Sequence, residues 1–318
     1  MPRQIRTKRR HLHHAHRFAQ ILAILITTGA ARLAVAAAPV YEGSFTSAGL
    51  CSPRGVDFSP SGDVFVGSDC HLQMHMEHFT SAGELVGTWA FPAGYFGSPN
   101  GVALDGSGNV YVTDYEGGRI LKLTSSGALI TSWGSLSGPV DLAVDGSGNI
   151  FVLELAGKRV QKYTANGSPL AMIGSAGTGP GQFQSPHGMG LDAGGRLYVA
   201  DWSRKRILRF LADGSFDMEF ATPVQPEDVA VGPDGNIYVI RFYTNGEYGQ
   251  VYQYSPSGVL LQRFGAPTGM DGAFRIAITP SGTIFITVQL EDRVTKFQLD
   301  ISTSAVSTTF GRLKTLYR

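Results

Sequence analysis

The sequence predicts an all-β protein, a six-bladed β-propeller made of four-stranded antiparallel blades. Three observations predict this fold. One phrase recurs six times at intervals of 40 to 47 residues, each copy holds short apolar runs separated by tight turns, and the copies show no helical periodicity. A single sheet cannot bury both of its faces, whereas sheets packed radially bury one another.

The six copies align on a Gly-rich turn between two apolar runs, as in "SPNGVALDGSGNVYVTD" at residues 98–114. They begin near Pro53, Pro99, Pro139, Pro186, Pro226 and Ala273, at spacings of 46, 40, 47, 40 and 47 residues. The composition agrees, because 41 Gly and only 16% charged residues favour strands and turns over long solvated helices.

Each copy predicts four strands. In the second copy, "GVALD" and "NVYVT" are rich in β-branched and aromatic residues and flank "DGSGN", where Gly and Asn tolerate a tight turn. "RILKL" and "ALITSWG" supply the third and fourth strands. A linear β-solenoid is the alternative architecture, but turns this tight do not suit parallel connections.

Two segments compete for the last outer strand that closes the ring. They are "VYEGSF" at Val40–Phe45 and "AVSTTFG" at Ala305–Gly311. The sequence does not choose between them.

Residues 1–38 differ from the rest and predict a signal peptide, which leaves residues 39–318 as the propeller. The segment holds seven basic residues and no acid, followed by the apolar run "FAQILAILITTG" and the small residues "AVAAAP". An uncleaved membrane anchor is the alternative, but a span of sufficient length would place Arg32 in the hydrocarbon. We therefore expect a secreted or periplasmic protein, monomeric and without stable membrane insertion after cleavage.

The charge of the mature chain bears on its partners. Residues 39–318 keep 19 basic and 25 acidic residues. Nucleic acid and anionic lipid both require clustered Lys and Arg, so this balance disfavours them as partners.

The stretch "IGSAGTGPGQFQSPHGMGLDAGGRLYVADWSRKRILRF", residues 173–210, resembles the NHL repeat, most of all in "GTGPGQF" followed by Pro. The resemblance covers essentially the whole mature chain and implies a propeller. It implies little about function, because the family includes adhesion and sensor modules, RNA-binding domains and a peptide-amidating lyase.

The two cysteines lie in loops that such a blade brings to the same face. Cys51 precedes the first strand of blade 1, and Cys70 follows the second. We expect them to form a disulfide, since an exported protein folds in an oxidising compartment.

A column of acids at the end of the second strand faces a column of arginines five residues later. The pairs in blades 2, 3 and 4 are Asp114 with Arg119, Glu154 with Arg159, and Asp201 with Arg206. We interpret them as structural pairs that fix a turn. The recurring sequence motif therefore has a structural role.

Blades 5, 6 and 1 depart from this rule and are neighbours in a closed ring. Blade 5 replaces the acid with Arg241 and inserts four residues in "RFYTNGEYGQ". Because departures from a repeat's own rule mark functional positions, we expect Arg241, Phe242, Tyr243 and Tyr248 to contact a ligand. Drift of an unused loop is the alternative.

A second set of candidates lies at the mouth of the central channel. Residues that follow the first Pro of each copy point there, and Arg54, Asn100, His187 and Glu227 are its polar members. Oxygen ligands in this region suggest an alternative Ca²⁺ or Mg²⁺ site formed by Asn100, Asp141, His187, Glu227 and Asp228. The competing interpretation is that these groups bind water and loop backbone.

Other chemistry is disfavoured. His75 and His78 of "CHLQMHMEH" point to opposite faces of a strand and cannot hold one ion. The amidating lyase of the resembling family uses several histidines, of which His187 alone has a counterpart here. The "GSGN" turns precede strands and do not cradle phosphate.

Together these patterns predict an exported, non-catalytic propeller without a cofactor that binds a protein, peptide or glycan on its top face. The alternative is a metal-dependent lyase or lactonase that uses the residues at the channel mouth.

Overall fold

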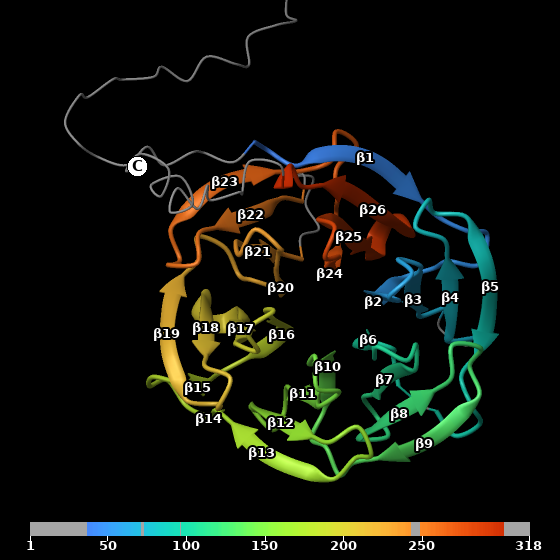
Figure 1. Cartoon of the computed structure of the whole chain (residues 1–318), viewed down its shortest axis with the longest axis horizontal. Helices are drawn as coiled ribbons and strands as arrows, with labels where there is room; N and C mark the ends of the chain where they lie inside the picture. The colour runs from blue at the N-terminus through green and yellow to red at the C-terminus, as the bar shows by residue number, and fades with distance from the viewer. Residues whose placement is uncertain (1–36, 71–72, 96, 243–248, 302–318) are drawn as a thin grey trace, which may run out of the picture. The chain divides into compact units, whose positions relative to one another are not determined.

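The computed structural model describes residues 37–70, 73–95, 97–242 and 249–301. Within these residues, six four-stranded antiparallel sheets surround a common centre, one for each sequence repeat (Figure 1). The predicted six-bladed β-propeller is confirmed. The expected signal peptide falls almost entirely on residues 1–36, outside the described residues.

Each of blades 1 to 3 runs from an inner to an outer strand in chain order. Blade 1 contains β2 (Pro53–Phe58), β3 (Val64–Ser68), β4 (His75–Phe79) and β5 (Leu85–Ala90). Blade 2 contains β6 (Val102–Leu104), β7 (Val110–Asp114), β8 (Arg119–Leu123) and β9 (Leu129–Trp133). Blade 3 contains β10 (Pro139–Val144), β11 (Ile150–Glu154), β12 (Arg159–Tyr163) and β13 (Pro169–Ile173).

A short parallel pair, β14 (Ser175–Ala176) with β15 (Gln182–Phe183), precedes blade 4. Blade 4 contains β16 (Pro186–Leu191), β17 (Leu197–Asp201), β18 (Arg206–Phe210) and β19 (Phe216–Ala221). Blade 5 contains β20 (Asp228–Val231), β21 (Ile237–Ile240), β22 (Val251–Tyr254) and β23 (Leu260–Phe264). Single 3-10 turns lie at η1 (Trp202–Arg204) and η2 (Gln289–Glu291).

Blade 6 joins the two ends of the described chain. It contains β24 (Ala273–Ile278), β25 (Thr283–Val288) and β26 (Arg293–Gln298), and β1 (Val40–Phe45) pairs antiparallel with β26 as its outer strand (Figure 1). Of the two candidates for ring closure, the structure selects Val40–Phe45. The rival segment, residues 305–311, lies outside the described residues.

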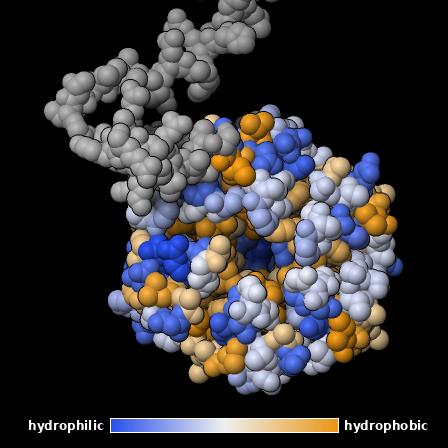
Figure 2. Space-filling view, in the orientation of Figure 1, coloured by the Kyte–Doolittle hydropathy of each residue, from blue (hydrophilic) through white to orange (hydrophobic). Residues whose placement is uncertain are grey.

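The core lies between neighbouring blades. The second strands β3, β7, β11 and β17 are buried at every position. In one apolar cluster, Phe151 and Leu153 of blade 3 pack with Leu197 and Val199 of blade 4. Burial between blades supplies the main stabilisation and leaves a hollow at the centre of the ring (Figure 2).

The predicted acid–arginine pairs form in blades 2, 3 and 4. Arg119 Nε lies 2.9 Å from Asp114 Oδ2, Arg159 Nε lies 2.7 Å from Glu154 Oε1, and Arg206 Nη2 lies 3.2 Å from Asp201 Oδ2. All three carboxylates are fully buried. Each also accepts backbone N–H groups, as Asp201 does from Ser185, so the pairs fix turns as expected.

The predicted disulfide is also present. Cys51 and Cys70 are bonded, with their Cα atoms 5.4 Å apart. His75 and His78 lie on opposite faces of β4, as the alternation of a strand requires: His75 contacts Glu77, and His78 contacts Asp63 and stacks on Phe65. In the described part of the chain, no helix has the length and apolar character needed to cross a bilayer.

Candidate functional site

A cavity of about 310 Å³ lies where the inner strands begin, on the side that we call the top face. All six blades contribute to its walls. Its polar lining consists of Arg54, Asn100, Glu116, His187, Glu227 and Arg275. Its apolar lining consists of Tyr115, Val140, Leu155 and Phe274. The four predicted polar residues at the channel mouth therefore meet in one cavity.

Arg54 is held in place from two sides. Its Nε donates to Asp69 Oδ2 at 2.8 Å, and its Nη1 donates to Asn100 Oδ1 at 2.8 Å. The guanidinium also lies 5.4 Å from the centre of the Phe274 ring. Since 23% of the side chain is exposed, it presents a fixed positive charge to the cavity.

His187 and Glu227 form the opposite polar wall. His187 Nδ1 lies 3.2 Å from Glu227 Oε2, and the imidazole stacks on the Trp202 ring at 5.4 Å with an interplanar angle of 9°. His187 Nε2 lies 3.2 Å from Ser185 Oγ. A partly exposed imidazole and a nearly buried carboxylate are thus oriented into the cavity opposite Arg54.

Arg275, which the sequence analysis did not single out, occupies the centre of the ring. It donates to the backbone carbonyls of four blades, at Asn100, Val140, His187 and Phe274. Its side chain is 4% exposed and lies 3.8 Å from Glu227 Oε1. It therefore forms the floor of the top cavity.

A comparison of the six repeats one residue further along would have found Arg275. That column reads Gly55, Gly101, Asp141, Gly188, Asp228 and Arg275. The glycines let inner strands approach, since a Cβ at Gly101 would lie 2.7 Å from the Cα of Asp141. In this column, two acids and one arginine stand among glycines, and this pattern indicates an ion pair at the centre of the ring.

Asp141 and Asp228 lie beside this arginine and bridge neighbouring inner strands. Asp141 accepts the N–H groups of Leu142 and Met189, and Asp228 accepts those of Val229 and Ile276. Burial raises the pKa of Asp141 to about 6, partly opposed by Arg275, and burial together with the Asp141 charge raises the pKa of Asp228 well above its usual value.

These contacts do not fit a Ca²⁺ or Mg²⁺ ion. Both oxygens of Asp141 and of Asp228 accept backbone N–H groups, and the Arg275 guanidinium lies 3.7 Å from Asp141. A divalent cation would adjoin a buried positive charge. Among the described residues, no three His, Cys, Asp or Glu side chains are grouped as metal ligands.

The irregular sector of blade 5 adjoins the top cavity through an aromatic contact. Arg241 and Phe242 are both partly exposed, and the Phe242 ring meets the Phe274 ring edge-to-face at 6.4 Å. Tyr243 and Tyr248 lie outside the described residues. The two predicted contact regions therefore join at Phe274.

The repeats match a known family. The NHL repeat family matches residues 96–123 and 183–210, which cover parts of blades 2 and 4, and the second match begins at Phe183, the last residue of "GTGPGQF". This chain carries NHL repeats. No protein of curated function matches this chain in sequence.

Several solved structures share the fold. A streptogramin B lyase structure superposes with a TM-score of 0.59 at 15% identity, over 82% of this chain and 98% of the other. A catalytically inactive variant of virginiamycin B lyase from Staphylococcus aureus with quinupristin matches with a TM-score of 0.59 at 15% identity, over 78% and 80%. A putative gluconolactonase matches with a TM-score of 0.60 at 16% identity, over 82% and 94%. At these identities the likeness concerns the fold.

Proposed function

We propose that this NHL propeller is an exported, non-catalytic protein that binds a protein, peptide or glycan on its top face. The observation that carries the proposal is the top cavity, in which Arg54, His187 and Glu227 converge from three blades with Phe274 between them and the blade 5 sector. Concave sites with an apolar wall and a few fixed polar groups are typical of ligand binding.

The geometry indicates the kind of group that enters. Arg54 supplies donors at one wall and Glu227 supplies an acceptor at the other, while Tyr115 and Phe274 supply aromatic surface. A sugar ring or a polar peptide side chain has the matching combination of acceptors, donors and an apolar face. The rest of the ligand would then lie across Arg241 and Phe242 on the rim.

Glycan and peptide arrays probed with the purified protein test this function. We expect Phe274→Ala and Glu227→Gln to lower the affinity for any array hit by about tenfold or more, because the first removes aromatic surface and the second removes the negative charge of the acceptor. Leu170→Ala is the matched control, since Leu170 is 52% exposed on the outer strand β13. If both cavity variants bind an array hit with the affinity of the wild-type protein, the proposal is overturned.

A second candidate function, a lyase, rests on the His187–Glu227 pair. An imidazole held by a carboxylate is a suitable general base, and a similar structure bears the description of a lyase. Quinupristin, the compound named with another similar structure, is a direct probe. Under the binding proposal its chromatographic retention and fragmentation spectrum stay unchanged after incubation, both of which an elimination would change even where the product is an isomer of the same mass. Conversion that His187→Ala abolishes would establish the enzyme.

Export completes the proposal and has its own test. The Cys51–Cys70 disulfide is compatible with an oxidising compartment outside the cytoplasm. We expect residues 1–38 fused to alkaline phosphatase to yield active enzyme in the bacterial periplasm, because that reporter needs export to form its disulfides. Fusions that stay inactive, beside an active control with a known signal, would contradict export.

A further inference from the structure

The opposite end of the central channel holds a second and larger cavity. It has a volume of about 550 Å³ and lies where the inner strands end, on the bottom face. Arg275 belongs to the lining of the top cavity and not to that of this one. The two cavities are therefore separate sites with different walls.

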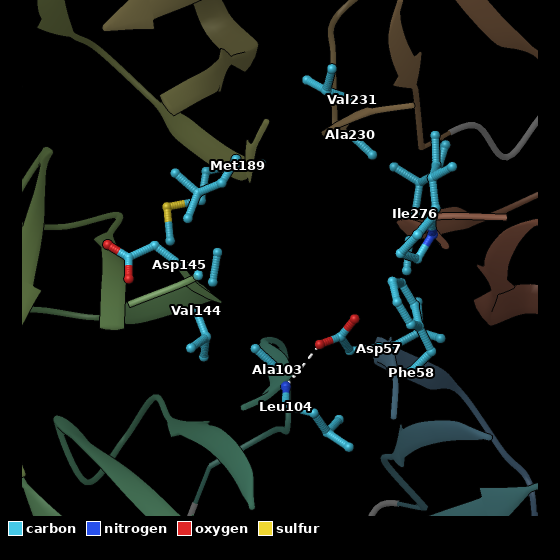
Figure 3. Close-up of a pocket in the computed structure, with 18 of the residues that line it drawn as sticks. Asp57, Phe58, Ala103, Leu104, Val144, Asp145, Met189, Ala230, Val231 and Ile276 are labelled. Atoms are coloured by element: carbon cyan, nitrogen blue, oxygen red, sulfur yellow. Dashed lines mark hydrogen bonds between the residues drawn. The ribbon is translucent and has the colours of Figure 1, made fainter. Parts of the chain in front are cut away.

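Most of the side chains that line the bottom cavity are apolar. Side chains such as Phe58, Leu104, Val144, Met189 and Ile276 surround it (Figure 3). Its size lies in the range that accommodates a small organic molecule. A hydrophobic compound that entered would bury apolar surface against these side chains, which favours binding.

The lining also holds three carboxylates, of which only that of Asp57 belongs to an inner strand. The corresponding positions of the other five blades are all small: Ala103, Ala143, Gly190, Ala230 and Ala277. The small residues keep the channel open, and blade 1 alone places an acid in it. The carboxylate points into the cavity, and its Oδ2 accepts the N–H of Leu104 at 2.8 Å (Figure 3).

The charged residues that line the cavity are all acidic. Its lining contains Asp57, Asp105 and Asp145, and no Lys, Arg or His. Asp105 is paired with Lys122 and Asp145 with Lys162, and the Asp145 carboxylate points away from the centre (Figure 3). Within the described part of the chain, Asp57 forms no ion pair. Burial accordingly raises its pKa to about 7, with backbone N–H groups opposing the rise.

We propose that the bottom cavity is a binding site for a small hydrophobic molecule that carries one protonated amine, with Asp57 as its counter-ion. The apolar walls take the hydrocarbon part, and the ammonium group supplies the cation that this buried carboxylate lacks. The site is independent of the top face, because the two cavities share no lining residue.

Calorimetric titration with 1-aminoadamantane and its neutral counterpart 1-adamantanol tests the site. We expect the amine to bind at least about tenfold more tightly than the alcohol, the contribution of one charge-assisted contact. Asp57→Asn should abolish this preference and keep the affinity for the alcohol. Asp213→Asn, which removes an exposed carboxylate from the β18–β19 turn, should leave the preference unchanged.

A second variant keeps the test decisive if Asp57→Asn fails to fold. Ala143→Phe fills the cavity from blade 3 and should remove binding of both compounds. Failure of both compounds to bind the wild-type protein, equal affinities for them, or an amine preference that survives Asp57→Asn would each overturn the proposal.

Discussion

At the scale of single residues, Arg275 links several blades at the centre of the ring. Its guanidinium connects the inner strands of four blades through carbonyl groups and lies near Asp141 and Glu227. Removal of one partner from a buried charged cluster is costly because the remaining charges lose their compensation. The chain therefore depends on this side chain far more than on its surface arginines.

Arg275→Met should lower the free energy of unfolding by about 3–5 kcal/mol at pH 8, measured in urea. The loss should shrink at pH 5, because burial already raises the pKa values of Asp141 and Asp228 and these acids can take up protons once the guanidinium is gone. Arg196→Met, which removes a half-exposed arginine from its pair with Asp192, is the control and should cost about 1 kcal/mol, because the Asp192 carboxylate keeps the Gly194 N–H, Arg196 N–H and Tyr198 O–H donors. Equal losses in the two variants would contradict this account.

Asp57 gives a second prediction at this scale, with a defined sign. Its pKa rises from 3.8 in the unfolded chain to about 7 in the fold, so the folded state binds more protons between these values. Stability therefore falls as the pH rises from about 4 to 7 and stays lower above that, by up to about 4 kcal/mol from this group. Asp57→Asn removes the penalty, since an amide is neutral and its oxygen can accept the Leu104 N–H.

Thermal unfolding across this pH range measures the effect. We expect Asp57→Asn to exceed the wild-type melting temperature at pH 8 and to equal it near pH 4. Asp213→Asn should show no gain over the wild type at pH 8, because hydrogen bonds from Ser215 lower the pKa of this exposed carboxyl group and do not raise it. A wild-type advantage at pH 8 would show that the ionised carboxylate is stabilising.

At the scale of elements, the disulfide supports the site as well as the fold. It joins the loop before β2 to the loop after β3, and the N–H of Asp69 donates to Cys51 O at 3.1 Å. Asp69 in turn holds Arg54 at the wall of the top cavity. The bridge therefore limits the movement of an arginine that is proposed to contact the ligand.

Replacement of both Cys51 and Cys70 by Ser should lower stability by about 3 kcal/mol, as expected for a loop with a sequence separation of 19 residues. Guanidinium unfolding of the oxidised and mutant proteins measures this difference. Dithiothreitol should shift the wild-type midpoint towards that of the variant and leave the variant unchanged. A variant with wild-type stability would show that the hydrogen bonds of Ser68 to Cys51 suffice.

The elements followed from the sequence because their signals are local. Period-two apolar runs and Gly-rich turns set each strand, and six aligned copies made the acid–arginine pairs visible. The floor of the top cavity did not follow, because Arg275 acts on carbonyl groups of distant blades and no local pattern reports such contacts. The irregular sector was recognised as a departure from the repeat, but its contact with Phe274 depends on how blades 5 and 6 meet.

At the scale of the whole molecule, closure of the ring depends on a strand that is distant in sequence from its blade. β1 pairs with β26 from Val40 opposite Gln298 to Phe45 opposite Val294. Phe45 also packs on Phe79 of blade 1, with ring centroids 4.9 Å apart, and on Phe285 of blade 6. Both candidate segments have strand-like sequences, so the sequence alone did not predict that Val40–Phe45 pairs with β26.

Deletion of residues 37–45 should therefore open blade 6. The edge of β26 would lose its partner and the Phe45 contacts would vanish, so we expect a lower melting temperature, a broader unfolding transition and hydrogen exchange that is faster in β26 than in β12 of blade 3. Deletion of residues 305–318 is the matched control and should leave all three unchanged, because β1 already occupies the edge. If the C-terminal deletion loosens β26 and the N-terminal one does not, the ring is closed by the other end of the chain.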